Sequence, residues 1–311
     1  DIDVLIKQAV FTSVRSGRNE GYQLAATSPG ISAEDARELS MWGPAHDSVY
    51  LERSATGCDN SHALDSGLHC VSRTVAAGRE YSGRGGERVY THAFLVPPEA
   101  FARFANSPFR VMDALIASGR TTVMKSIPKQ LQPVPLVGRA TAVNTTNLEK
   151  LCRTIGPNKL ASLLNAALTT SELGVVTDVS PDRLLAGLLD LLPLPHRPAY
   201  SLTTGLKASP RRPFRLTILP AEGDEQRRVK RQLGLNVLDL TREPPAEFAP
   251  DRGWPLLMHG LLQAHQFATI SSVADTLAET TEKNLHALAE QLQHDLDQGD
   301  LLVDILTPFS V

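Results

Sequence analysis

Apolar and polar positions alternate in short runs over the first part of the chain, a pattern typical of β-strands that bury one face. Such runs cover residues 4–12, 22–28, 69–75 and 88–96. We expect the last two to pair as antiparallel neighbours, because only a glycine-rich turn separates them. Residues 43–66 show neither a strand period nor a helical one, and we predict a loop there.

Helical periods in the same region begin at recognisable caps. Ser32, with Asp35 three residues later, predicts the N-cap of a short helix. Pro98 suits the first position of a second helix, where its missing N–H is not needed, and a third helix follows over residues 108–118. Residues 127–138 then contain three prolines and no helical period, so we expect an extended connector between domains.

Strands and helices alternate beyond this connector, an order that predicts an α/β unit. Residues 147–169 have the period of one amphipathic helix, and residues 181–192 are predicted to form a second helix that is capped by Ser180. The remaining elements are strands at residues 174–180, 199–205, 214–220 and 236–240 and a charged helix at residues 224–232.

The segment after Pro250 is predicted to be helical throughout. One helix covers residues 254–267, and leucines with helical spacing line one face of another. These leucines are Leu277, Leu285, Leu288, Leu292 and Leu296. Such a stripe is more often a core or helix–helix contact than a functional feature, whereas an exposed stripe would be a docking surface for the rest of a longer protein or for another subunit.

These patterns predict an α+β N-terminal domain with antiparallel strands and a hairpin, followed by an α/β region and a helical C-terminal segment. The predicted domain boundaries are residues 1–126, 139–250 and 251–311. A chain of 311 residues is long enough for two domains or more, and it buries a sizeable core without disulfides.

Composition alone indicates an ordinary globular protein, with 42% apolar residues, 21% charged residues and a net charge of −3. The charge is nevertheless uneven. Residues 197–231 hold nine basic and three acidic residues, a net charge of +6, whereas residues 274–304 hold eight acidic residues and one lysine, a net charge of −7. We expect the two blocks to face each other or a partner, although a solvated surface is the commoner explanation of a charge run.

Several classes of partner and setting find no support in the sequence. Aromatic residues make up 5% of the chain and none interleaves the basic stretch Ser201–Leu216 in a stacking pattern, so we expect no sequence-specific nucleic-acid binding. No run of 18 apolar residues predicts a membrane span. Cys58, Cys70 and Cys152 lack disulfide spacing and fit a reducing compartment, so a cytoplasmic location is expected. The first residue, Asp1, indicates a piece of a longer protein or a removed tag.

Two glycine-containing stretches bear on phosphate binding, and neither has the context that it needs. The stretch Gly119–Ser126 ends in Lys-Ser as a P-loop does, but Met124 stands where the second glycine is required and Pro128 follows at once. The stretch EYSGRGGERVYTHAF, Glu80–Phe94, leads into a strand rather than a helix, so its glycines predict a hairpin turn.

The side chains around this hairpin form the first candidate binding site, because converging guanidinium groups capture anions. The residues that would bind a phosphorylated ligand there are Arg73, Arg79, Tyr81, Arg84, Arg88 and His92. The second candidate is Ser201–Leu216, SLTTGLKASPRRPFRL, a polar and basic stretch between two strands. Its candidate residues for an anion or an acidic partner surface are Thr204, Lys207, Arg211 and Arg212. The alternative is a polar connector whose turn is fixed by Pro210 and Pro213.

Metal ligands and nucleophiles are less well supported. Cys58, His62, His69 and Cys70 lie close in sequence without the CxxC spacing of zinc sites, and adjacent strand residues point to opposite faces. The sequence has no G-x-S-x-G elbow and no cysteine-protease signature. We therefore expect no metal, no cofactor and no catalytic residue.

Several sequence blocks carry a family resemblance. In order they are QAVFTS, ATSPGIS, WGPAHDS, CVSRT, EYSGRGGERVYTH and FLVPPE, and LPLPHRPAYSLTTGLKASPRRPFRL follows later. Together they resemble the N-terminal region of the bacterial GTPase-associated proteins of predicted NTP-dependent conflict systems, over roughly residues 4–220. The resemblance implies a protein that is encoded beside a GTPase and acts as its partner or adaptor. It supplies no catalytic motif.

The leading hypothesis is therefore a non-catalytic cytoplasmic binding or adaptor module that associates with a GTPase in a bacterial conflict or signalling system. The alternative is an enzyme or sensor that binds a nucleotide or another phosphorylated ligand through the arginine-rich hairpin. A third hypothesis is a structural scaffold that oligomerises through its C-terminal helices.

Overall fold

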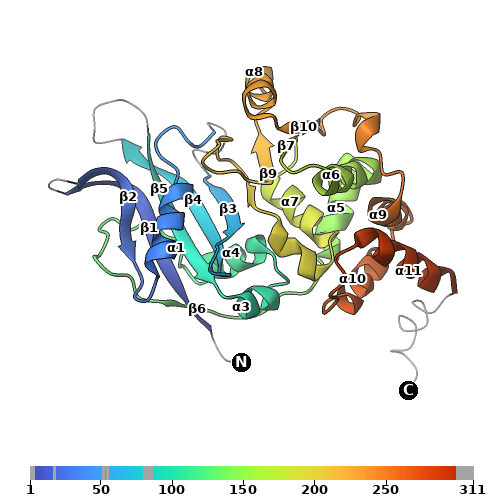
Figure 1. The fold of residues 1–311 in the computed structure, drawn as a ribbon, viewed down its shortest axis with the longest axis horizontal. Coiled ribbons are helices and arrows are strands. Elements are labelled where there is room, and N and C mark those ends of the chain that lie inside the picture. Colours follow the sequence, from blue (N-terminus) through green and yellow to red (C-terminus); the bar gives the residue numbers. More distant parts are fainter. Residues whose placement is uncertain (1–3, 17–18, 51–52, 54–55, 80–86, 299–311) are drawn as a thin grey trace. The chain divides into compact units, whose positions relative to one another are not determined.

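The structure, a computed structural model, describes residues 4–16, 19–50, 53, 56–79 and 87–298 (Figure 1). Its internal contacts divide the chain into two compact units. Unit 1 consists of Asp1–Ala140, Glu172–Thr177 and Pro198–Val237, and unit 2 consists of Thr141–Ser171, Asp178–Arg197 and Leu238–Val311. These units alternate along the chain, whereas the three predicted domains are contiguous. The boundaries at residues 126–139 and 250–251 stay a prediction.

Unit 1 is built on one mixed β-sheet with the strand order β10-β7-β9-β8-β3-β4-β5-β1-β2, and β6 pairs with β1. The strands are β1 (Val4–Ser16), β2 (Asn19–Thr27), β3 (Cys58–Ala63), β4 (His69–Arg79), β5 (Glu87–Val96), β6 (Val134–Leu136), β7 (Leu173–Val176), β8 (Leu202–Thr203), β9 (Leu216–Leu219) and β10 (Asn236–Asp239). Strands β7, β9 and β8 are parallel, whereas β3, β4, β5, β1 and β2 are antiparallel to their neighbours. The antiparallel pair β8–β3 joins the two halves.

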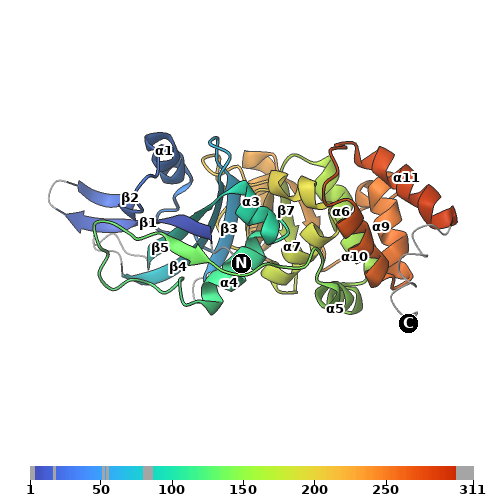
Figure 2. The same cartoon turned by 90° about the horizontal axis from the view of Figure 1, so that it is seen from below.

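Helix α1 (Ala33–Trp42) lies on one face of the antiparallel half (Figure 2). Ser32 Oγ accepts a hydrogen bond from the N–H of Asp35 at 3.0 Å, so the N-cap expected from the sequence is confirmed. Leu39 packs against small residues of this face. The apolar cluster comprises Ala9, Leu39, Leu64, Cys70, Ala93 and Leu95.

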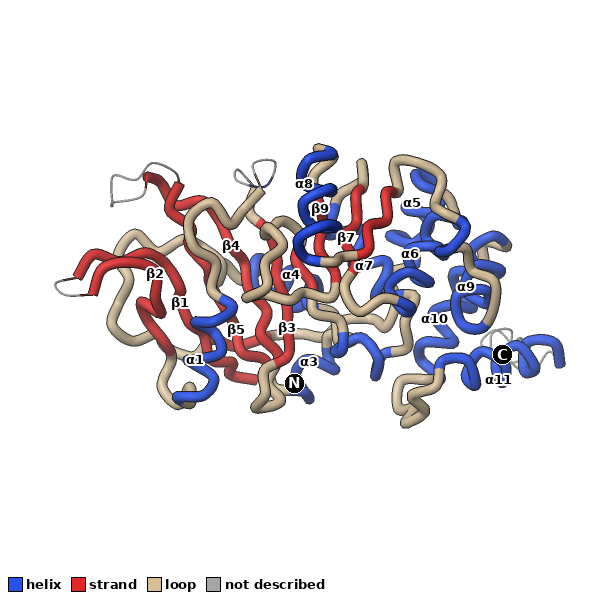
Figure 3. Tube along the Cα trace, turned by 45° about the horizontal axis from the view of Figure 1, so that its top comes forward, coloured by secondary structure: helices blue, strands red, loops and turns tan. Residues whose placement is uncertain are grey.

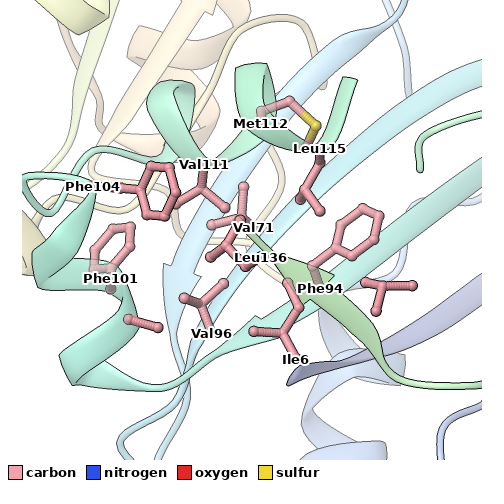
Figure 4. Close-up of a cluster of buried hydrophobic side chains, with 12 residues drawn as sticks. Ile6, Val71, Phe94, Val96, Phe101, Phe104, Val111, Met112, Leu115 and Leu136 are labelled. Carbon is pink, nitrogen blue, oxygen red and sulfur yellow. The ribbon is translucent and has the colours of Figure 1, made fainter. Parts of the chain in front are cut away.

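Helices α3 (Pro98–Arg103) and α4 (Pro108–Ala117) cover the opposite face. Pro98 and Pro108 occupy their first turns, where a missing N–H removes no helical hydrogen bond. Figure 4 shows the apolar side chains of both helices gathered against the strands. The buried cluster includes Ile6, Val71, Phe94, Val96, Phe101, Phe104, Val111, Met112, Leu115 and Leu136.

The loop predicted at residues 43–66 is wrong in part, because strand β3 lies inside it. Its sequence, CDNSHA, has no apolar alternation, although most of its residues are buried. Asn60 Nδ2 donates to Thr74 Oγ1 at 3.0 Å, and Asn60 Oδ1 accepts from Thr203 Oγ1 at 2.7 Å. Side-chain hydrogen bonds to both neighbouring strands thus stabilise a central strand that apolar contacts would usually bury.

Unit 2 is helical, as the colouring by secondary structure shows (Figure 3). Its α-helices are α5 (Thr145–Ile155), α6 (Pro157–Thr169), α7 (Pro181–Asp190), α9 (Gly253–Gln263), α10 (Phe267–Thr276) and α11 (Leu285–Gln298). The single helix predicted over residues 147–169 is wrong, because the chain breaks at Gly156. Its φ of 87° lies in the left-handed region that favours glycine, and Pro157 then begins α6.

The helical C-terminal segment divides differently from the prediction. The helix expected over residues 254–267 ends at Gln263. Leu277 is the C-cap of α10, so the leucine stripe does not lie on one helix. Leu288 and Leu292, on α11, are 4% and 3% exposed and belong to the core of unit 2. An oligomer interface through these helices stays a prediction.

The predicted fold class is confirmed. Antiparallel strands and a hairpin form the N-terminal part, strands and helices alternate in the middle, and the C-terminal segment is helical. Among the helices of the described ranges, none combines the length and the apolar character that crossing a bilayer requires.

Candidate functional site

The candidate segment Ser201–Leu216 is built into the sheet of unit 1. It supplies β8 and the turn that follows, and the carbonyl of Gly205 accepts a hydrogen bond from the N–H of Tyr50 at 2.9 Å. A Cβ on Gly205 would lie 2.6 Å from Arg53 Cγ and 2.9 Å from Cys58 Cβ. Glycine is therefore required by the close approach of these chains.

Two candidates from distant parts of the sequence meet at the end of β8. Arg73, on β4, donates from Nη1 to Asp59 Oδ1 at 2.7 Å and from Nη2 to the carbonyl of Thr56 at 2.8 Å. Thr204 Oγ1 accepts from the N–H of Asp59 at 2.9 Å and from Arg53 Nη2 at 3.4 Å. Asp59 joins the two candidates, and its carboxylate neutralises Arg73. An anion arriving here would compete with Asp59 for the guanidinium group.

Strands β4 and β5 form the hairpin that the glycines indicated, and Arg79 is the last residue of β4. Arg88, near the start of β5, donates from Nε to the carbonyl of Ala77 at 3.1 Å and is half-buried. Tyr81 and Arg84 lie outside the described residues. Ligand binding by the hairpin stays a prediction.

His92 lies opposite Arg73 in the register of β4 and β5, but the two side chains contact different strands. His92 Nε2 donates to Gln8 Oε1 on β1 at 2.6 Å, and the residue is 1% exposed. Burial lowers the pKa of His92 to about 4, so the ring is neutral at pH 7. The contacts of Arg73 and His92 thus lead to β3 and β1 rather than to one shared position.

A pocket of about 370 Å³ adjoins the turn that follows β8 in unit 1. Its apolar walls are Ala208, Pro210, Pro213, Phe214, Leu233 and Leu235, and its polar lining is Glu172, Ser209, Arg212, Thr217 and Gln232. This volume is within the range of small-molecule sites, roughly 300–1,000 Å³. Of the candidate residues predicted from the sequence, Arg212 lines this pocket.

The three basic candidates of this segment differ in exposure. Arg211 is exposed, Lys207 is half-buried and Arg212 is 8% exposed. Arg212 Nη2 donates to the carbonyl of Lys207 at a long 3.5 Å, and Arg212 Nε has no acceptor among the described residues. Burial lowers the pKa of Arg212 below its ordinary value, and the charge of Arg211 also lowers it.

Ala208, one of the residues that line the pocket, is tied by a hydrogen bond to helix α8 (Gly223–Arg228), which carries an internal ion pair. Arg228 donates to both carboxylate oxygens of Glu225 at 2.7 Å, and its Nη2 also donates to the carbonyl of Ala208 at 3.2 Å. Tyr50 Oη donates to Glu225 Oε1 at 2.6 Å. These hydrogen bonds, first that of Arg228, lower the pKa of Glu225. The Glu225 carboxylate is therefore engaged by Arg228 and Tyr50.

The metal-ligand candidates divide between the two faces of the sheet. His69 Nε2 lies 2.6 Å from Ser61 Oγ on the face of α3 and α4, whereas Cys58, His62 and Cys70 lie on the face of α1. Over the described ranges, no three or more potential ligand residues are grouped so as to hold a metal ion. The three cysteines are buried and form no disulfide among the described residues, and burial raises the pKa of Cys70 to about 12.

His62 has surroundings that the sequence did not indicate, because it lies in the unpredicted strand β3. Its ring stacks on Trp42 with centroids 4.0 Å apart, and Phe214 lies 6.5 Å away. The residue is 4% exposed, and neither ring nitrogen has a hydrogen-bond partner among the described residues. Burial lowers its pKa to about 3. The adjoining cavity of about 20 Å³, lined also by Asn60 and Ser72, has room for about one water molecule.

The P-loop-like stretch Gly119–Ser126 lies in irregular chain between α4 and β6. A phosphate-binding loop needs a helix N-terminus directly after its glycines, and no helix follows here within the described chain before α5. The structure thus lacks, in this stretch, the context that the chemistry requires.

Residues 5–134 match the family model described as GTPase-associated protein 1, N-terminal domain type 2. The matched residues hold β1–β5 and the helices on both faces of that half of the sheet, whereas β7–β10 and the Arg212 pocket lie beyond them. No curated protein and no solved structure matches the chain significantly. The resemblance inferred from the sequence blocks is thus confirmed for residues 5–134, the part of the chain that matches the GTPase-associated protein 1 family.

Proposed function

We propose that this chain is a non-catalytic adaptor that binds a GTPase in a bacterial conflict or signalling system. The observation that carries the proposal is the match of residues 5–134 to a domain whose description names association with a GTPase. Its proposed location is the cytoplasm, which suits three buried cysteines that form no disulfide among the described residues.

Unit 1 presents two groups of exposed cations to a partner. Group A, which lies outside the matched domain, is Arg211, Lys230 and Arg231. Group B, which lies within the matched domain, is Arg120, Lys125 and Lys129. None of these six forms an ion pair with a described residue. Unpaired surface cations speed association with an acidic surface and make it sensitive to salt.

Binding of the full chain to the GTPase encoded beside it tests the proposal. Biolayer interferometry with the GTPase loaded with GDP, or with a non-hydrolysable GTP analogue, is expected to show saturable binding in at least one state. Absence of binding in both states would refute the adaptor function. Since the adaptor is proposed to be non-catalytic, we expect no turnover of GTP by the chain alone.

Charge reversal then locates the contact. Replacing the three cations of group B by glutamate changes the charge as much as replacing the three of group A does, so each triple variant is the matched control of the other. We expect the group B variant to associate about tenfold more slowly, because its residues belong to the matched domain. A larger effect of group A would place the contact outside that domain.

A further inference from the structure

Arg212 lines the 370 Å³ pocket of unit 1 and has no acidic partner among the described residues. Arginine stays protonated in proteins, so burial cannot discharge it. The residue is 8% exposed, its Nε has no acceptor among the described residues, and its one side-chain hydrogen bond, to the carbonyl of Lys207, is 3.5 Å long. A buried charge without a partner costs stability, which calls for a compensating interaction.

The backbone that carries Arg212 is fixed in advance. The N–H of Arg212 donates to the carbonyl of Ser209 at 3.0 Å, and the N–H of Arg211 donates to Ser209 Oγ at 3.3 Å. Pro210 and Pro213 restrict φ on either side of the turn. Because this segment is ordered before any ligand arrives, binding would cost little conformational entropy.

The lining of the pocket defines the chemistry that it would accept. Arg212 offers a planar set of donors suited to a phosphate or a carboxylate, and the hydroxyl of Ser209 adds another donor nearby. Phe214 and Leu233 present an apolar wall for the body of the ligand. Glu172, also in the lining, accepts a hydrogen bond from an N–H or O–H group.

We propose that this pocket binds a small organic anion, with its phosphate or carboxylate group on Arg212 and its apolar body against Phe214 and Leu233. Both the lining residues and Arg212 lie outside the matched residues 5–134. The proposed site is therefore independent of GTPase association, and either can be present without the other.

Isothermal titration of the full chain with phenyl phosphate, benzoate and inorganic phosphate tests the site. We expect at least one of the two aromatic anions to bind more tightly than inorganic phosphate, because the ring removes apolar wall from water. Arg212→Gln is expected to weaken that binding by about tenfold or more. Arg211→Gln removes the same charge from the exposed neighbour and is expected to change the affinity by less than about twofold.

The relative affinities of phenyl phosphate and benzoate assign the head group as phosphate or carboxylate. The proposal fails if no probe binds the natural chain, if Arg212→Gln binds as tightly as the natural chain, or if Arg211→Gln has the same effect as Arg212→Gln. Hydrogen exchange needs no variant: the bound probe is expected to slow exchange at residues 208–214 and 232–235. Unchanged exchange in both segments at a saturating probe concentration would also overturn the proposal.

Discussion

Arg197 in unit 2 and Arg212 in unit 1 are both buried, with 1% and 8% of their surfaces exposed, but their surroundings differ. Arg197 donates to two backbone carbonyls at 3.0 and 2.7 Å, and its Nη1 lies 3.6 Å from Asp190 Oδ1. Asp190 Oδ2 in turn accepts from the N–H of Asn144 at 2.9 Å. Arg212 makes only the 3.5 Å contact with the carbonyl of Lys207 and has no described acidic partner.

The difference separates an arginine whose hydrogen bonds belong to the fold from the one for which we propose a ligand. The donors of Arg197 connect α7 with the chain before α5, so its hydrogen bonds are part of the folded state of unit 2. Arg212 keeps its donors for another acceptor while lining a cavity. Burial alone therefore does not distinguish the two arginines, whereas the partners of the guanidinium group and the adjoining cavity do.

The largest loss of stability is expected from Arg197→Met. It leaves Asp190 buried without its cation and removes the donor from the carbonyl of Ala142. We expect the free energy of unfolding of unit 2 to fall by about 3–5 kcal/mol. Hydrogen exchange resolves the two units, and faster exchange is expected in α5 and α7. The exposed Arg183→Met, on α7, is the control and is expected to change stability by less than about 0.5 kcal/mol.

The double variant Arg197→Met/Asp190→Leu sharpens this test. Removing both charges leaves no unpaired ion, so the double variant is expected to be more stable than Arg197→Met alone. If the double variant is less stable by the sum of the Arg197→Met and Asp190→Leu effects, the pair is not coupled, and Arg197 stabilises unit 2 through its hydrogen bonds to backbone carbonyls alone.

Unit 1 buries neutral histidines as well as Arg212, which has no described acidic partner. The variant His62→Phe tests whether one of these histidines is neutral in the folded chain. The pKa of His62 in the folded chain is about 3, below its ordinary value of about 6.5, so the unfolded chain takes up the proton first. Its contribution to stability is complete above pH 6.5 and is lost as the pH falls toward 3. The slope is about 1.4 kcal/mol per pH unit.

His62→Phe is expected to remove this slope and to retain stability at pH 7, since neither ring nitrogen has a described partner and phenylalanine still stacks on Trp42. Urea unfolding at pH 7 and pH 5 measures both quantities. His69 and His92, whose pKa values burial lowers to about 4, keep their own slopes and serve as internal references. An unchanged acid slope in the variant would show that His62 is not the buried neutral group described.

Much of this fold was predictable because local signals agree with tertiary contacts. Ser32 capped the helix that it indicated, and Pro98 began another. Strand β3 was not predictable, since its burial depends on hydrogen bonds from Asn60 to Thr74 and Thr203, and the last of these lies 143 residues away. No local pattern reports such a distant partner.

The candidate site was predictable only as a segment. The sequence indicated Ser201–Leu216 through its arginines and prolines, but it gave Arg211 and Arg212 equal weight. The structure separates them: Arg212 is buried and lines a pocket together with Leu233 and Leu235, about twenty residues further along the chain, whereas Arg211 is exposed. Similarly, the shared partner Asp59 of Arg73 and Thr204 appears only when β3, β4 and β8 are side by side.

Asp59→Asn is expected to change stability less than Arg197→Met does, because its partner Arg73 has surroundings intermediate between those of Arg197 and Arg212. It has an acidic partner, but its side chain is 26% exposed and water can replace part of the lost interaction. We expect unit 1 to lose about 1 kcal/mol. Urea unfolding with Glu20→Gln as the control, which breaks the exposed pair with Arg15, measures the difference. If both variants lose the same free energy of unfolding, the pair of Arg73 and Asp59 contributes no more than an ordinary exposed ion pair.

The smallest and most diagnostic change in stability is expected from Arg212→Met. Methionine keeps the length and apolar stem of the side chain and removes a charge that has no described acidic partner, so the ligand-free chain should be unchanged or more stable by about 1 kcal/mol. The exposed Arg211→Met is the matched control, and thermal unfolding without added anions measures both. A loss of more than about 1 kcal/mol in Arg212→Met alone would show that Arg212 stabilises the fold as Arg197 does. The burial of Arg212 would then be explained by its contribution to the fold, without a ligand.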